Sequence, residues 1–112
     1  PAIAWRVEVG DQLIVFAGDF SNAKNVFPEF AERADALVVS HAIPENARGL
    51  ASELFATPGQ IGRVASQAGV RMLILGHRTN RTRGVESQSR AAIEAEYGNP
   101  LLFANDLECW GL

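Results

Sequence analysis

Three residues that could bind a metal ion or transfer a proton, Asp19, His41 and His77, each come at the end of a short apolar run. Carboxylate and imidazole groups are common zinc ligands and common general acids and bases. If the apolar runs are strands of one open sheet, these side chains converge beyond the carboxyl ends of the strands. Taken singly, each has a simpler explanation, as a turn former or as a histidine satisfied by a backbone carbonyl. The coincidence of three favours a site.

The first half of the chain predicts a β-hairpin and two further elements. Residues 4–9 alternate between apolar and charged side chains, and an apolar run at 13–17 follows Gly10 and Asp11, which predicts a half-exposed strand, a turn and a buried strand. Ser21 or Asn22 would cap a partly helical segment ending near position 34. Ala36–Ser40 reads as a short buried strand.

The second half alternates helices and strands. Thr57, Pro58 and Gln60 have the spacing of a capping box with proline at the first helical position, and Gly69 ends the helix. A helical turn or two is expected within 45–55, a helix at 85–97, and strands at 71–75, 101–104 and 107–110. Strands joined by helical crossovers predict a parallel sheet. We therefore expect one domain over residues 1–112, of α/β (α+β) class, with a mixed sheet and helices on one face.

Composition limits the functional class. Of 112 residues, 47% are hydrophobic and 21% charged, which is typical of a folded protein, and a net charge of -3 gives no general attraction to nucleic acid or anionic lipid. The single cysteine, Cys109, suits a reducing compartment, and no apolar run approaches the length of a membrane span. We expect a soluble, cytoplasmic protein with Trp5, Cys109 and Trp110 in its core.

Three segments carry a resemblance to a known family: LIVFAGD at 13–19, ADALVVSHA at 34–42 and VRMLILGH at 70–77. In this order, with the helix after Thr57 and the closing LLFANDL at 101–107, they resemble the second half of the metallo-β-lactamase superfamily, and the resemblance covers nearly the whole chain. It implies the C-terminal half of an αββα sandwich.

The resemblance also implies a metal centre. By it, Asp19 bridges two divalent ions and His77 is the last histidine ligand; zinc is the expected metal, with manganese or iron as alternatives. The family's His-x-His-x-Asp-His run is absent, as is a further histidine expected before Asp19. Since a catalytic zinc needs about three protein ligands, we expect this chain alone to bind no metal tightly and to be inactive. A missing N-terminal half, or self-association, would cover its open, apolar sheet surface.

Within the superfamily the chain is most similar to the phosphodiesterase branch that includes the tRNase Z-like endonucleases. Ser40 and Phe55 stand where that branch has histidines that assist proton transfer, so processing of transfer RNA is not expected. His41 falls where the branch has a glutamate, which implies a catalytic role as proton donor to a leaving group or a role in orienting a ligand.

Two further groups of polar residues are candidates for supporting roles. Arg78 and Arg81 follow His77 closely and could clamp an anionic substrate, although a solvated surface loop explains them as well. Asn105 and Asp106 could hydrogen-bond the site histidines on the side away from the metal ions, or form a simple turn.

Together these observations predict a metal-dependent hydrolase acting on a small anionic ester or phosphodiester. The alternative is a metal-free α/β interaction module that self-associates or pairs with another chain through its exposed strand edges.

Overall fold

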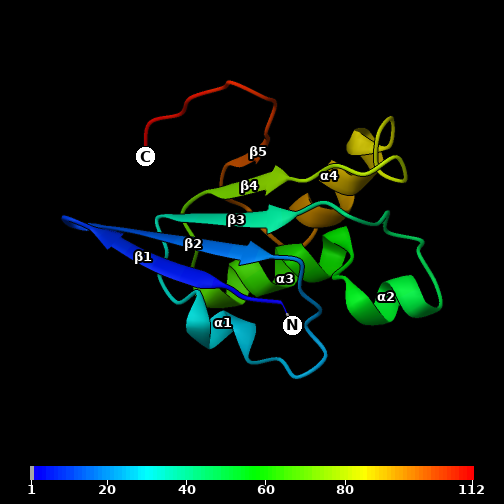
Figure 1. Cartoon of the computed structure of the whole chain (residues 1–112), viewed down its shortest axis with the longest axis horizontal. Coiled ribbons are helices and arrows are strands. Elements are labelled where there is room, and N and C mark those ends of the chain that lie inside the picture. The colour runs from blue at the N-terminus through cyan, green and yellow to red at the C-terminus, as the bar shows by residue number, and fades with distance from the viewer. Residues whose placement is uncertain (1) are drawn as a thin grey trace.

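The computed structural model describes residues 2–112, and its framework is a five-stranded mixed sheet (Figure 1). Its strands are β1 (Trp5–Val9), β2 (Gln12–Gly18), β3 (Ala36–Ser40), β4 (Leu73–Gly76) and β5 (Leu101–Phe103), which lie side by side in this order. β1 is antiparallel to β2, and all other neighbours are parallel. The predicted mixed sheet and the α/β class are confirmed.

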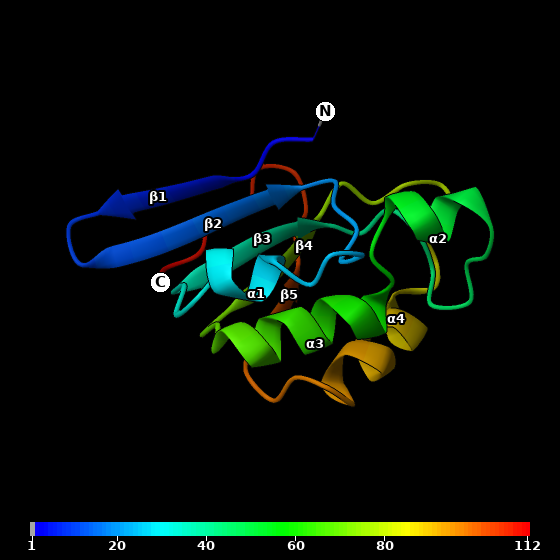
Figure 2. The ribbon, with the colours of Figure 1, turned by 90° about the horizontal axis from the view of Figure 1, so that it is seen from below.

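Helices cover one face of this sheet (Figure 2). α1 (Phe27–Phe30), α3 (Pro58–Ala68) and α4 (Glu86–Glu94) pack there, and α2 (Leu50–Leu54) lies beyond the carboxyl ends of the strands. α3 begins with the predicted capping box, in which Thr57 and Gln60 hydrogen-bond each other's backbone N–H, and ends at Gly69 in the left-handed region with φ of 65°. Within the described residues, no helix has the length and apolarity needed to cross a membrane.

The core lies between the sheet and the helices. Alternate strand residues point into it, because successive side chains of a strand face opposite sides of the sheet. The largest buried side chains are Val15, Leu37, Val39, Leu73 and Leu75 from the strands and Ile61, Val64 and Ile93 from the helices.

Two predicted elements are wrong. α1 has only four residues and follows Val26 with no side-chain cap, so Ser21 and Asn22 do not begin it. No strand forms at 107–110, where Leu107 has a positive φ of 65° that breaks an extended backbone.

The core assignment of three residues is also wrong. Trp5 and Trp110 are 64% and 39% exposed, and Cys109 is exposed. Trp5 lies opposite Phe16 in the β1–β2 register. Phe16 alternates with Val15 and Ala17, which face the core, so Phe16 and Trp5 point to the sheet face without helices. All five residues of β1 are exposed rather than half of them, because among the described elements β1 packs closely only against β2 and has no helix layer over its inner face.

Candidate functional site

Asp19 and His77 meet at the carboxyl end of the sheet. His77 Nδ1 lies 3.1 Å from Asp19 Oδ1 and 3.3 Å from the Oγ of Ser40, the last residue of β3. The side chains of Asp19 and His77 are 42% and 64% exposed, so a ligand can reach both. The structure thus brings together the two residues expected to bind metal, and their role as ligands stays a prediction.

The backbone on both sides of this contact is unusual. Gly18 has a φ of 61° next to a register shift at the end of β2, and a Cβ there would lie 3.3 Å from the carbonyl oxygen of Ile3. A glycine therefore permits the bend that delivers Asp19. His77 itself has a φ of 47°, a conformation uncommon outside glycine and often retained at functional sites.

The Asp19–His77 pair fits part of a metal site. Carboxylate oxygen and imidazole nitrogen are ligands of zinc and of other divalent first-row metals. Among residues 2–112, however, no group of three or more His, Cys, Asp or Glu side chains is placed to hold an ion. A catalytic centre needs further ligands from outside the described residues.

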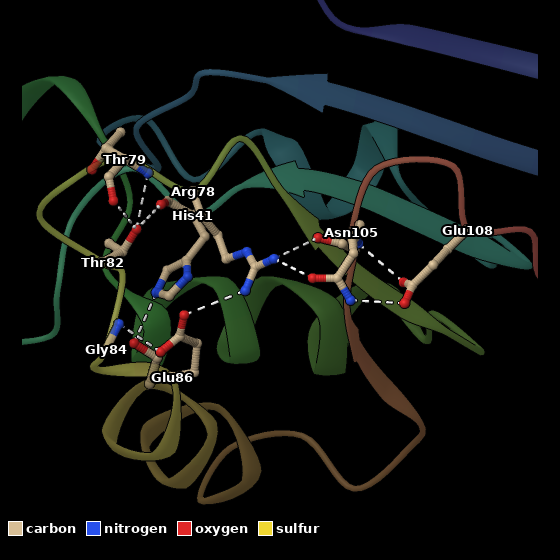
Figure 3. A network of polar contacts seen from close by, with 10 residues as sticks. His41, Arg78, Thr79, Thr82, Gly84, Glu86, Asn105 and Glu108 are labelled. Atoms are coloured by element: carbon tan, nitrogen blue, oxygen red, sulfur yellow. Dashed lines mark hydrogen bonds and ion pairs between the residues drawn. The ribbon is translucent and has the colours of Figure 1, made fainter.

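His41 takes no part in the Asp19–His77 contact; its side chain is buried, with the ring turned toward α4 (Figure 3). It continues the side-chain alternation of Leu37 and Val39, so its ring points to the helix side and is fully buried. Its Nε2 lies 2.8 Å from the Oγ of Ser89 on α4, and its Nδ1 is buried without a hydrogen-bond partner. Ser40, one residue earlier, faces the other way and takes the place beside His77.

The surroundings of the His41 ring favour its neutral form. Burial lowers the pKa of His41, the negative charge of Glu86 opposes this shift, and the positive charge of Arg78 adds to it. A buried, neutral histidine bonded to a serine is typical of a structural residue. The expected catalytic role of His41 stays a prediction, and it would require a route for the proton other than direct contact with solvent.

Arg78 is held by neighbouring groups rather than extended toward solvent (Figure 3). Its guanidinium donates to the carboxylate of Glu86 at 3.3 Å, to the Ala104 carbonyl at 3.1 Å and to the side-chain oxygen of Asn105. Asn105 in turn donates its amide to Glu108. Asn105 therefore supports Arg78, and neither Asn105 nor Asp106 hydrogen-bonds a histidine in the part of the chain described.

The loop after His77 is fastened to the end of β3. The Thr82 hydroxyl, fully buried, donates to the His41 carbonyl, and the Thr79 hydroxyl donates to the Ala42 carbonyl, both at 2.8 Å. The backbone of this loop is thus anchored to the end of β3.

A polar hollow of about 450 Å³ opens beside His77. It is lined by His77, Arg78, Arg83, Ala104, Asn105 and Asp106. Arg83 was not among the residues expected to bind substrate, whereas Arg81, which was, is exposed and does not line the hollow. Nothing in the local sequence distinguishes the two arginines, because which one faces the hollow depends on the anchoring of Thr79 and Thr82.

Comparison with known proteins identifies the fold. No protein-family model matches the chain, and no curated protein does. Among solved structures, 26 chains match, including the crystal structure of the metallo-β-lactamase fold protein YhfI from Bacillus subtilis, with a TM-score of 0.82 and 24% sequence identity. The alignment covers 96% of this chain and 43% of that chain, so the chain spans less than half the length of that protein. Nearly the whole chain therefore has the fold of part of a metallo-β-lactamase fold protein.

Proposed function

We propose that this chain supplies Asp19 and His77 to the dinuclear metal centre of a hydrolase that cleaves small anionic esters, phosphodiesters above all. The observation that carries the proposal is the 3.1 Å contact between these two side chains at the carboxyl end of a metallo-β-lactamase-type sheet. Zinc is the metal that best suits a carboxylate and an imidazole, with manganese or iron as alternatives.

Each residue of this chain has a distinct part in the proposal. The carboxylate of Asp19 would bridge the metal ions and the imidazole of His77 would bind one of them, while Ser40 orients the His77 ring through its hydroxyl. When bound, the metal ions supply an activated water and stabilise the charge that develops on the substrate.

The charges beside His77 support an anionic substrate. The positive charge of Arg78 is neutralised by its ion pair with Glu86, so Arg78 is suited to a structural role in the lining of the hollow. Arg83 lines the same hollow and has no ion pair among the described residues, so its charge is available to a substrate oxygen, with Asp106 as the competing carboxylate. We assign substrate binding to Arg83 at the hollow, with Arg81 as a second, outer contact.

His41 is retained as a candidate general acid or base; because burial favours its neutral ring, it would have to take up a proton through Ser89 before it could donate one to a leaving group. Ser89 lines a separate hollow of about 480 Å³ between residues 44–46 and α4, which gives the buried ring an indirect connection to solvent. A structural role for His41 predicts a different outcome, and the two are separated by the His41→Ala experiment below.

Metal content tests the proposal directly, in a protein that carries this chain together with the rest of the fold. Asp19→Ala and His77→Ala should each lose metal, measured by mass spectrometry of bound metal, and should lose hydrolysis of bis(p-nitrophenyl) phosphate. Asp106→Ala, a carboxylate in the same region, is the matched control and should keep the metal. Full metal content in both Asp19→Ala and His77→Ala would refute the assignment.

The substrate class has its own test. Arg83→Ala should raise the KM for the phosphodiester by roughly tenfold or more, the loss expected for one charge-assisted contact. Arg81→Ala should change KM less. If Arg81→Ala has the larger effect, the anion binds at the outer position.

A metal-free interaction module remains the second candidate, and the observation that favours it is the fully exposed edge strand β1. A complete protein that contains this chain, binds no zinc or manganese and hydrolyses no ester would establish the module instead.

A further inference from the structure

The outer edge of β1 has the features of an interface. β1 is the first strand of the sheet order and pairs only with β2, and all five of its residues are exposed. An edge strand presents unpaired backbone N–H and C=O groups that another strand can bind.

The hairpin geometry shows which backbone groups face outward. Gly10 and Asp11 form a two-residue turn, with φ of 62° at Gly10, and Val9 opposes Gln12 at its base. The two residues that close such a turn form a hydrogen-bonded pair, and from there hydrogen-bonded and non-hydrogen-bonded residue pairs alternate along the two strands. The backbone groups of Arg6 and Glu8 therefore point away from β2.

From this pattern we propose that β1 pairs antiparallel with β1 of a second copy of this chain, about a two-fold axis at Val7. In this register Arg6 opposes the partner's Glu8 and Glu8 opposes the partner's Arg6, and both pairs use the outward backbone groups. A two-fold contact of this kind uses the same surface on both copies and closes without further growth.

The side chains on both faces of β1 fit this register. Arg6 and Glu8 share the helix side of the sheet, where the Arg6 guanidinium is held by the Phe30 carbonyl at 3.0 Å and lies only 4.0 Å from the Glu8 carboxylate. The Arg6 guanidinium also donates to the Glu32 carbonyl at 3.3 Å, so it is held in place. The Glu8 side chain, 75% exposed against 36% for Arg6, is the one that can turn to the partner. On the other face, Trp5 would contact the partner's Val9, and the apolar surface would continue across the axis.

Charge also disfavours the neighbouring registers. A shift by two residues in one direction places Arg6 against the partner's Arg6, and in the other direction places Glu8 against the partner's Glu8. Like charges directly opposite each other destabilise a strand pair. Only the register centred on Val7 joins opposite charges at both positions.

Charge-reversal variants test this register by sedimentation velocity of the 112-residue chain. Glu8→Arg and Arg6→Glu should each weaken self-association by about tenfold or more, because like charges then oppose each other. An equimolar mixture of the two variants should form a heterodimer as stable as the wild-type dimer, since opposite charges again meet at both positions. Far-UV circular dichroism checks that each variant is folded.

Every other outcome overturns the proposal. A wild-type chain that stays monomeric at millimolar concentration has no such interface, and variants that associate like the wild type, or a mixture that stays monomeric, exclude this register. Phe16→Lys identifies the main competitor, because it charges the open face while leaving the outer edge of β1 intact. If Phe16→Lys makes the dimer dissociate and neither charge variant does so, the two copies associate through their open sheet faces.

Discussion

His77 Nδ1 lies 3.1 Å from Asp19 Oδ1 although 58 positions separate the two residues in the chain. Their strands, β4 and β2, are not neighbours, because β3 lies between them and contributes Ser40 to the same contact. The parallel arrangement of the three strands is what brings their carboxyl ends to one edge of the sheet.

The isolated chain should bind zinc weakly. Two protein ligands and water hold a zinc ion poorly compared with the three or four ligands of native sites. Isothermal titration of zinc into the 112-residue chain should give a dissociation constant above the micromolar range, unchanged in the control Asp106→Ala. A stoichiometric site with sub-micromolar affinity on the monomer would contradict this prediction.

His41→Ala should leave the metal content of the complete enzyme nearly intact and lower turnover by about two to four orders of magnitude, the usual contribution of a general acid or base. Metal content and rate measured on the same samples as Asp19→Ala and His77→Ala separate the possibilities. Loss of metal would make His41 a ligand, and unchanged turnover in a folded variant would make it a structural residue only. His41→Gln, which keeps a hydrogen-bonding group beside Ser89, controls for loss of packing.

The stability of the chain should fall as the pH drops below about 6.5, the ordinary pKa of histidine. Burial lowers the pKa of His41 in the folded state, so in this range the unfolded state binds a proton that the folded state does not, and the free energy of unfolding decreases as pH falls. Urea unfolding between pH 7 and pH 5 measures this slope, in a window above the lowered pKa values of Asp35 and Glu86. The slope should be smaller in His41→Gln, and an identical slope in both proteins would show that another group titrates.

Gly62→Ala should destabilise the chain by about 1–3 kcal/mol, the usual cost of overpacking. A Cβ at Gly62 on α3 would lie 2.8 Å from the carbonyl oxygen of Ile93 on α4, so the two helices would have to separate. Gly98→Ala is the matched control, since a Cβ there meets nothing within 4 Å and should change little. Thermal or urea unfolding of both variants measures the difference, and equal stabilities would show that the helix crossing tolerates the methyl group.

The sequence by itself determined the features that depend on neighbouring residues. The capping box of Thr57 and Gln60, the Gly10–Asp11 turn and the positions of β1 to β5 follow from hydrogen bonds and hydrophobic alternation over a few positions. The order of strands and crossovers also fixed a parallel arrangement at β2 to β5, and with it the meeting of Asp19 and His77. The sequence prediction that His41 joins this pair does not follow in the same way, because His41 continues the alternation of Leu37 and Val39 toward the helices.

Tertiary structure alone decided the other contacts between residues that are distant in the chain. Burial beside Ser89 removed His41 from the site edge, and contacts with Glu86, Ala104 and Asn105 made Arg78 part of the wall of the hollow. Hydrophobicity favours burial of Trp5 in any sequence, but burial requires a layer to pack against, and the helices cover only the opposite face of the sheet. Hydrogen-bond partners and covering layers come from segments far along the chain, so no local pattern can specify them.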